Sequence, residues 1–363
     1  MAKTLDQVLG YRSLTGIITS PNGGVPNVWP EACFTGATVR PIVGDTAEWT
    51  QVPNSRRTSR SNNYGSKSRE QDMVDIIGRV GKCVHSFEHI NHKMNVLTAL
   101  RNMEDMEAQK RGQAIVDIQT AEFRRKFNNL RVAAVSSIFR HGAVYFDGDG
   151  NLLPSSSGAV TTVDMQVPAN NKNQLNSAIS ASWATDGTDV LGDLATIQLR
   201  AVQATGLPLK YAYYGKSICE YLTSNTTVKE LLKANASMSE AFTMNRIPKG
   251  FGIENLEWRP LYTSYYVDND GTDREWFPGD FIVFMPEVTP DWYLMLEGSF
   301  EVPTSVNPTA DANSANSDFK TVQGMFSYAH PTSDPPGIKH LAGDTFLPAL
   351  RNPSAVFLAD VVA

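Results

Sequence analysis

The chain of 363 residues has little cysteine and no long apolar run, and both absences narrow what it can be. Its 3 cysteines, Cys33, Cys83 and Cys219, are odd in number and widely spaced, so we expect no disulfide framework. No apolar run approaches the ~20 residues of a membrane-spanning helix, and the N-terminal residues lack the apolar core of a signal peptide. We therefore expect a protein that is made in the cytosol and has no membrane segment.

Charged residues make up only 19% of the chain, and they are unevenly distributed. The net charge is −6, which argues against general binding of nucleic acids. Residues 1–143 carry 19 basic and 13 acidic side chains, whereas residues 144–363 carry 13 and 25. Two interpretations stay open. Either this polarity has no function, or a basic element of one copy lies on an acidic region of the next, where complementary potentials fix the register.

Proline is absent from residues 54–153, although the chain contains 20 prolines. The first part of this stretch, residues 54–69, is rich in Ser and Asn, and no acidic residue balances its basic side chains before Glu70. Those basic residues are Arg56, Arg57, Arg60, Lys67 and Arg69. Strand-like runs at 38–43, 48–52 and 73–80 flank the segment, so we predict a long hairpin that presents it.

Three interpretations fit the basic segment 54–69. A solvated loop needs no further explanation of its charge. A contact with single-stranded nucleic acid has weak support, because only Tyr64 could stack on a base. A protruding charged loop beside a long helix is more typical of contacts between subunits than of an active site. We therefore treat the five basic side chains as candidates for contact with a neighbouring subunit.

The second part of the proline-free stretch, residues 94–141, predicts a very long helix. Apolar residues recur there at spacings of three and four and form one stripe. They are Val96, Leu100, Met103, Met106, Phe123, Phe127, Leu130, Ala134 and Ile138. Gly112 costs ~1 kcal/mol relative to Ala and marks a place where the helix can bend. Gly142, directly after Arg140 and His141, is a C-terminal stop signal.

The remaining segments predict a mixed order of helices and strands. Residues 1–38 contain three prolines and no helical period after about Tyr11, so we expect an extended arm. Asp189 is placed to cap a helix that Gly206 ends. Short helices are expected at 217–223 and 228–232, and a surface loop at 303–318. Strands are expected at 143–146, 152–153, 159–167, 209–214, 256–261, 264–267, 281–285, 292–296 and 354–362. The order indicates an α+β fold without βαβ repetition.

Residues with metal-binding or catalytic chemistry are sparse. His85, Glu88, His89 and His92 form one metal-like cluster where a strand is expected to change to a helix, but their spacing nominates no complete ligand set. Residues 147–151 open like a calcium loop, but position 12 is Gly158 instead of Glu, so we predict a turn. The phosphate-loop, dinucleotide and nucleophile-elbow motifs are absent. We expect no enzyme activity, no cofactor and no metal.

The order of several segments resembles a known family. The segments are AEFRRKFNNLRVAAVSSIFRHGAV at 121–144, the region 190–215, NTTVKEL at 225–231, FPGDFIVFMP at 277–286 and NPSAVFLADV at 352–361. Together they are similar to the tailed-phage major capsid proteins, in particular the lambda-type major head protein family with the Hong Kong-97 capsid fold. The likeness covers about residues 35–363. The arm 1–34 and the polar insert 303–318 depart from it.

The resemblance implies a division of the chain into five parts. Residues 1–38 would form the N-terminal arm, and 39–90 an extended loop that lies over a neighbouring subunit. Residues 91–188 would form the peripheral domain with its spine helix, and 189–345 the axial α+β domain. The tail 346–363 would return to the sheet as a strand. Covalent Lys–Asn crosslinking, known in one branch, is not implied, because nothing marks Lys67 as reactive.

The resemblance also implies a structural function. Hexamers and pentamers would form an icosahedral head around double-stranded DNA, without sequence-specific binding. Assembly would take place in the host bacterial cytoplasm, the product would be part of the virion, and separate scaffolding, portal and decoration proteins could be partners. Two alternatives stay open. They are an encapsulin-type nanocompartment shell and a soluble metal-dependent enzyme that uses the region His85–His92.

Overall fold

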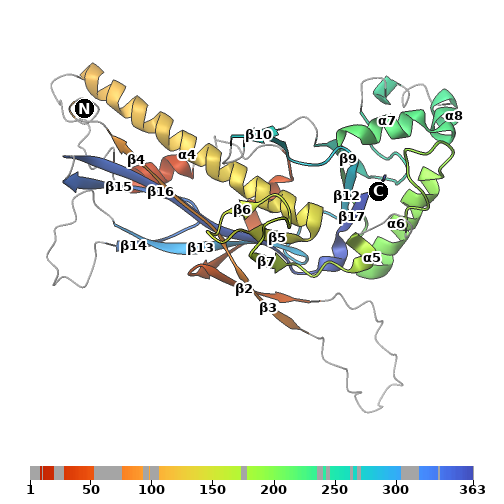
Figure 1. The fold of residues 1–363 in the computed structure, drawn as a ribbon, viewed down its shortest axis with the longest axis horizontal. Coiled ribbons are helices and arrows are strands. Elements are labelled where there is room, and N and C mark those ends of the chain that lie inside the picture. The colour runs from red at the N-terminus through yellow and green to blue at the C-terminus, as the bar shows by residue number, and fades with distance from the viewer. Residues whose placement is uncertain are drawn as a thin grey trace, which may run out of the picture.

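The fold is elongated, with a long helix laid across a sheet and a second lobe at one end (Figure 1). This computed structural model describes residues 9, 11–19, 28–52, 76–92, 98, 106–172, 178–234, 240–242, 246–261, 265–267, 271–303, 319–333 and 336–362. The helices are α2 (Tyr11–Ile18), α4 (Met106–His141), α5 (Ala169–Lys172), α6 (Val190–Thr205), α7 (Lys216–Ser224) and α8 (Thr226–Ala234). Short 3₁₀ turns are η1 (Glu31–Cys33), η2 (Gly36–Thr38) and η3 (Pro353–Ala355).

The strands belong to several sheets and alternate with the helices along the chain. They are β1 (Val39–Val43), β2 (Thr46–Gln51), β3 (Ile77–Lys82), β4 (Val84–His92), β5 (Ala143–Phe146), β6 (Leu152–Leu153), β7 (Thr161–Asp164), β8 (Tyr211–Tyr214), β9 (Glu257–Pro260), β10 (Tyr265–Val267), β11 (Asp273–Glu275), β12 (Phe281–Met285), β13 (Tyr293–Pro303), β14 (Phe319–Gln323), β15 (Phe326–Ser333), β16 (Pro336–Leu350) and β17 (Phe357–Asp360). The predicted α+β class is confirmed.

The long helix α4 contains 36 residues and is therefore about 54 Å long. In the second half of the helix the predicted apolar stripe faces the core, with Phe123, Phe127 and Ile138 each at most 2% exposed, whereas Met106 at its start is 50% exposed. The helix runs without interruption through Gly112. It ends as expected at Gly142, which has φ 69° and donates its backbone N–H to the carbonyl of Ile138. Residues 94–97 and 99–105 of the predicted helix lie outside the described residues.

A six-stranded sheet lies beneath α4 and is organised around β16. This strand pairs antiparallel with β15, β4 and β13, while β13 also pairs antiparallel with β14 and parallel with β1. Arg131 of α4 reaches the sheet and forms buried ion pairs with Asp344 of β16 and Glu297 of β13. Burial alone would lower the pKa of this guanidinium, but the two carboxylates outweigh burial and raise it. The charged side chain therefore ties the helix to two strands.

The second lobe contains a four-stranded sheet in the order β17, β12, β8, β9, with α6, α7 and α8 around it (Figure 1). Trp183, Leu194, Tyr214 and Phe284 are among the fully buried side chains of its core. Helix α6 begins as predicted, because the Asp189 carboxylate accepts the N–H of Gly192 at 3.0 Å. The C-terminal strand β17 pairs with β12, so the end of the chain closes this lobe.

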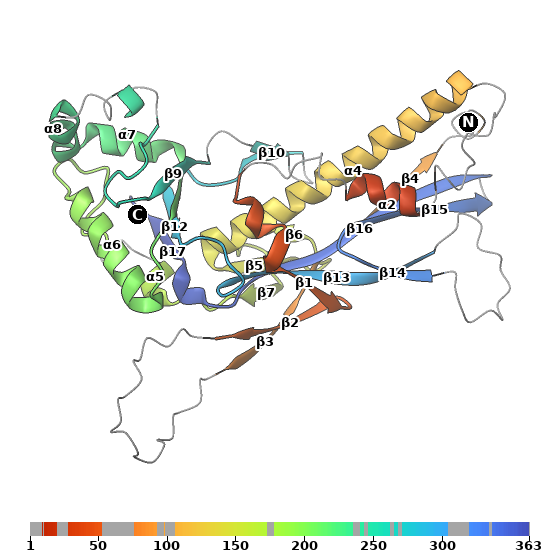
Figure 2. The same cartoon turned by 180° about the vertical axis from the view of Figure 1, so that it is seen from behind.

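The N-terminal arm contains a helix that was not expected. Residues 11–18 form α2, which lies beside α4 on the same face of the sheet (Figure 2). The prediction of a fully extended arm is therefore wrong. Leu14 and Ile18, four residues apart, are both buried, and Ile18 packs in a cluster with Phe123 and Phe127 of α4 and Ala342 of β16. A helix this short is marginal alone, so its tertiary contacts, which a local pattern cannot show, stabilise it.

Candidate functional site

The most prominent feature outside the two lobes is a hairpin made by β2 and β3, which protrudes from the sheet (Figure 1). The strands pair antiparallel with Trp49 opposite Arg79. The predicted hairpin is thus confirmed at its base. The strand at 39–43 has a different partner, because β1 pairs with β13 in the six-stranded sheet.

The base of the hairpin is fixed to the body of the protein through Gln51. Its buried Nε2 donates to the carbonyls of Met165, at 3.0 Å, and Leu350, at 3.3 Å. Arg79 of the opposite strand donates its Nε–H to Gln51 Oε1 at 3.0 Å. The sequence analysis missed this role of Gln51, because its partners lie 114 and 299 residues away along the chain.

The hairpin and its surroundings expose several large apolar side chains. Val43 is 92% exposed, Val80 66%, Ile76 64% and Ile77 46%. An isolated exposed apolar residue is ordinary, but a group of them on a protruding element is typical of a surface that binds a partner. The hairpin can therefore offer apolar contacts in addition to the charges that its sequence carries.

The five basic candidates, Arg56, Arg57, Arg60, Lys67 and Arg69, lie in the segment that joins β2 to β3. Residues 53–75 are outside the described residues, so the role of these side chains in contacts stays a prediction. The structure describes the two strands that lead into and out of the segment.

The histidine cluster does not form where it was expected. His85, Glu88, His89 and His92 all lie on the single strand β4, which does not change to a helix within this range. Alternation along a strand places His85 and His89 on one face and Glu88 and His92 on the other. His85 Nδ1 instead lies 2.6 Å from Thr345 Oγ1, and Lys126 donates to Glu88. Within the described part of the chain, no group of residues could hold a metal ion.

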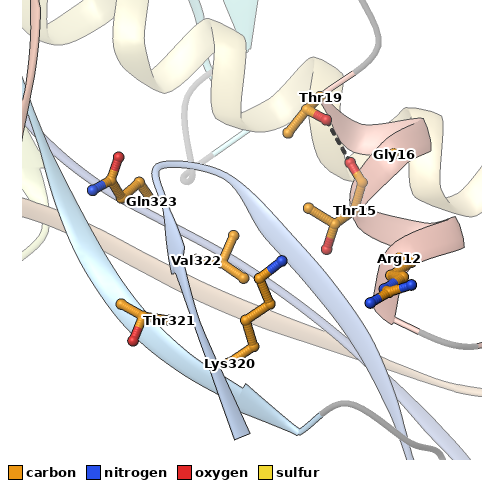
Figure 3. A pocket seen from close by; sticks show the side chains of 8 residues that line it. All are labelled: Arg12, Thr15, Gly16, Thr19, Lys320, Thr321, Val322 and Gln323. Atoms are coloured by element: carbon orange, nitrogen blue, oxygen red, sulfur yellow. Dashed lines mark hydrogen bonds between the residues drawn. The ribbon is translucent and has the colours of Figure 1, made fainter.

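A groove of about 580 Å³ separates α2 from β14 (Figure 3). Its lining consists of Arg12, Thr15, Gly16, Thr19, Lys320, Thr321, Val322 and Gln323. These side chains include two cations and several hydroxyls, but no histidine, cysteine or carboxylate. The groove therefore lacks the pair of a nucleophile and a base that covalent catalysis requires.

The three cysteines are buried and unpaired, as expected. Burial raises the pKa of the Cys83 thiol to about 12, with the nearby Asp45 carboxylate as a smaller cause. Burial also raises the pKa of Cys219 to about 11, with Glu220 as a smaller cause. A thiol with such a pKa carries almost no thiolate at neutral pH and is a poor nucleophile.

Comparison with solved structures shows which class of protein has this fold. The chain is similar over its full length to the solved structure of the prophage capsid protein of E. coli CFT073. The TM-score is 0.56 and the identity 14%, covering 98% of this chain and 99% of that chain. At this identity the similarity establishes the fold alone, which is that of a phage capsid protein.

Two further structures are similar at lower scores. A phage-related protein of Bordetella bronchiseptica RB50 has a TM-score of 0.48 and 10% identity, covering 97% of both chains. The SrpI encapsulin of Synechococcus elongatus PCC 7942 has a TM-score of 0.45 and 11% identity, covering 93% of this chain and 91% of that chain. A sequence search of curated proteins finds no match.

The family itself is established by a sequence model. The model of the phage major capsid protein E family matches residues 86–361, which is most of the chain. The chain belongs to this family. It is therefore a structural protein of the bacteriophage capsid, part of the virion, and it assembles in many copies into a shell. The predicted capsid function is confirmed, and it fits better than the encapsulin alternative. Among the described residues, no helix is long and apolar enough to cross a membrane.

Proposed function

We propose that this protein is the major capsid protein of a tailed phage and forms hexamers and pentamers that close an icosahedral head around double-stranded DNA. The observation that carries the proposal is the protruding β2–β3 hairpin. Its base is held rigidly by Gln51, and its strands expose Val80 and Ile77 to solvent. An element that is fixed at its base and apolar at its surface suits a permanent contact with a neighbouring copy.

The segment 54–69 completes this contact. Its side chains Arg56, Arg57, Arg60, Lys67 and Arg69 meet acidic groups of the adjacent subunit, which fix the register of the two copies. The distribution of charge supports the proposal, because residues 144–363 carry 25 acidic and only 13 basic side chains. Buried apolar contacts at the hairpin base supply affinity, and the charged tip supplies specificity.

Each part of the chain has a place in the proposed shell. The arm 1–38 and the loop 39–90 reach neighbouring subunits, and 91–188 with α4 forms the peripheral domain. Residues 189–345 form the axial domain that meets its counterparts at the centre of the capsomer, and 346–363 return to the sheets. Within the range 189–345 the strands β13–β16 pair with β1 and β4 in the sheet beneath α4, so the proposed axial and peripheral parts share this sheet.

The proposal also covers the other components of the head. DNA is enclosed without sequence-specific contacts, which agrees with a subunit of net charge −6. Scaffolding, portal and decoration proteins are separate chains, and assembly takes place in the host cytoplasm. The subunit has no enzyme activity of its own.

Reversal of charge in the segment 54–69 tests the proposal. The variant Arg56→Glu/Arg57→Glu/Arg60→Glu should leave the subunit folded, as measured by circular dichroism, and should reduce closed shells at least tenfold in sedimentation velocity and electron microscopy. The matched control Arg56→Lys/Arg57→Lys/Arg60→Lys keeps the charge and should assemble normally. Normal shells from the glutamate variant would refute the role of these residues.

A further inference from the structure

Two histidines are buried against each other between the sheet and α4. His92 ends β4, and His340 lies on the neighbouring strand β16. Their rings stack with centroids 5.4 Å apart and an interplanar angle of 22°. His92 is 4% exposed and His340 is 0% exposed, and the ring of Phe123 from α4 meets His340 edge-on. Buried histidines are uncommon enough to need an account of their hydrogen bonds.

The hydrogen bonds of this pair are incomplete. His340 Nε2 lies 2.7 Å from Ser327 Oγ, and the Ser327 hydroxyl donates to the carbonyl of Leu341. Among the described residues, His340 Nδ1 and both ring nitrogens of His92 have no partner. A neutral imidazole has one donor, whereas an imidazolium has two. Protonation of either ring therefore creates a buried, charged donor without an acceptor, which is costly.

The charged groups around the pair are engaged elsewhere. On β4, Glu88 is bound by Lys126 of α4, and on β16, Asp344 is bound by Arg131 of α4. Arg124 of α4 donates to the carbonyl of Ile17 in α2. Among the described residues, the other titratable groups near this part of the sheet are Arg12 of α2, on its exposed side, and His89, Tyr328, His330 and Lys339, on the opposite face of the sheet. No described carboxylate forms an ion pair with either ring.

Ser327 connects the histidine pair to α2. The Thr15 hydroxyl of α2 donates to the carbonyl of Ser327 at 3.0 Å and accepts the Ser327 N–H at 3.2 Å. The Thr15 hydroxyl thus satisfies the backbone N–H and carbonyl of Ser327, which a neighbouring strand would otherwise pair with. The same serine contacts His340 through its side chain, so Ser327 is the shared partner of the ring and of α2.

The two helices that cover this region differ in how firmly they are held. Helix α4 has 36 residues and the buried ion pairs of Arg131, whereas α2 has 8 residues. The described side-chain contacts that hold α2 are the burial of Leu14 and Ile18, the two Thr15 bonds to Ser327 and the Arg124 bond to Ile17. When the sheet beneath them is destabilised, α2 is therefore the first of the two to open.

We propose that the His92–His340 pair makes the docking of α2 acid-sensitive: below about pH 6, protonation of the rings favours a state in which α2 leaves β15 while α4 stays on the sheet. The inference depends on the fold of one subunit and not on the shell geometry proposed above. It gives the N-terminal arm a release that responds to pH.

The direction of the effect follows from proton binding. Burial, and to a smaller extent the neighbouring His92, lowers the pKa of His340 to about 3, and burial also lowers the pKa of His92. In the open state Ile18 and Thr15 of α2 leave this part of the sheet, water reaches the ring pair, and the pKa of each ring rises toward its ordinary value of about 6.5. The open state therefore binds more protons than the closed state below that pH. As the pH falls further, the population of the open state rises about tenfold per pH unit for each proton taken up.

Hydrogen exchange of the full-length protein between pH 7.5 and 5 tests this inference. After correction for intrinsic exchange, the amides of α2 should lose protection by at least tenfold between pH 6.5 and 5.5, while those of α4 and α6 stay constant. Protection of α2 that does not change with pH, or loss of protection in α4 together with α2, would overturn the proposal. This comparison needs no variant and holds even if substitutions impair folding.

Variants then assign the effect to the pair. His92→Phe keeps an aromatic ring at the stack, and His340→Gln keeps a partner for Ser327, so the double variant should abolish the pH dependence of α2. The control His330→Gln changes an exposed histidine on the opposite face and should leave the dependence unchanged. An unchanged pH dependence in a folded double variant would contradict the assignment.

Discussion

Both oxygens of the Asp344 carboxylate accept hydrogen bonds from Arg131, one from Nε and one from Nη2, each at 2.7 Å. Asp344 is completely buried on β16, and Arg131 lies on α4, 213 residues away along the chain. Nη1 of the same guanidinium donates to Glu297 of β13 at 2.7 Å. One side chain therefore joins the spine of the subunit to two strands of its main sheet.

Removal of the guanidinium should be strongly destabilising. Arg131→Met leaves the buried Asp344 carboxylate without a partner, so we expect a loss of about 3–5 kcal/mol in the free energy of unfolding. The matched control is Arg125→Met on the same helix, whose pair with Glu122 is solvent-exposed. That change should cost at most ~1 kcal/mol. Urea denaturation of both variants measures the difference, and similar values for the two would contradict the structural role of Arg131.

Gly81 on β3 should not tolerate a side chain. A Cβ at this position would lie 2.7 Å from Val163 Cγ1 and 3.3 Å from Leu347 Cδ2, where the hairpin packs on the body. Gly81→Ala should therefore destabilise the protein by about 1–3 kcal/mol. Gly78 on the same strand has no atom within 4 Å of such a Cβ, so Gly78→Ala is the control and should be nearly neutral. Thermal unfolding compares them, and an unaffected Gly81→Ala variant would show that the hairpin base is loosely packed.

The thiols should be inert in the native protein. Burial raises the pKa of Cys33, Cys83 and Cys219, so almost no thiolate is present at pH 7.5. Ellman's reagent should label fewer than one thiol per native chain within an hour and all 3 after unfolding in urea. Rapid labelling of the native protein would contradict the burial of these residues.

The sequence predicted those helices and strands whose caps and apolar patterns lie within the element itself. The helix α6 has its cap at Asp189 and its stop at Gly206, and β12 is the apolar run 281–285. The long stripe of α4 was equally clear. In each case residues close together in the sequence carry the information, and the tertiary contacts agree with it.

Elements defined by distant contacts could not be predicted in this way. Residues 340–350 of β16 are all buried, although they include His340, Asp344 and Thr345. Both faces of this strand are covered, so it shows no alternation, and the partners of Asp344 and Thr345 are the distant residues Arg131 and His85. Contacts with distant segments also explain why α2 and the role of Gln51 were missed. Helix α2 is stabilised by β15 and α4, and the carbonyl partners of Gln51 come from two distant segments.

The central claim is that many copies of this chain close into a shell, and electron microscopy of the purified protein tests it most directly. We predict closed particles tens of nanometres across, whose reconstruction shows hexamers and pentamers with the β2–β3 hairpin of each subunit against its neighbour. A protein that stays monomeric at high concentration, with no particles in the presence of its phage's other head proteins, would contradict the account.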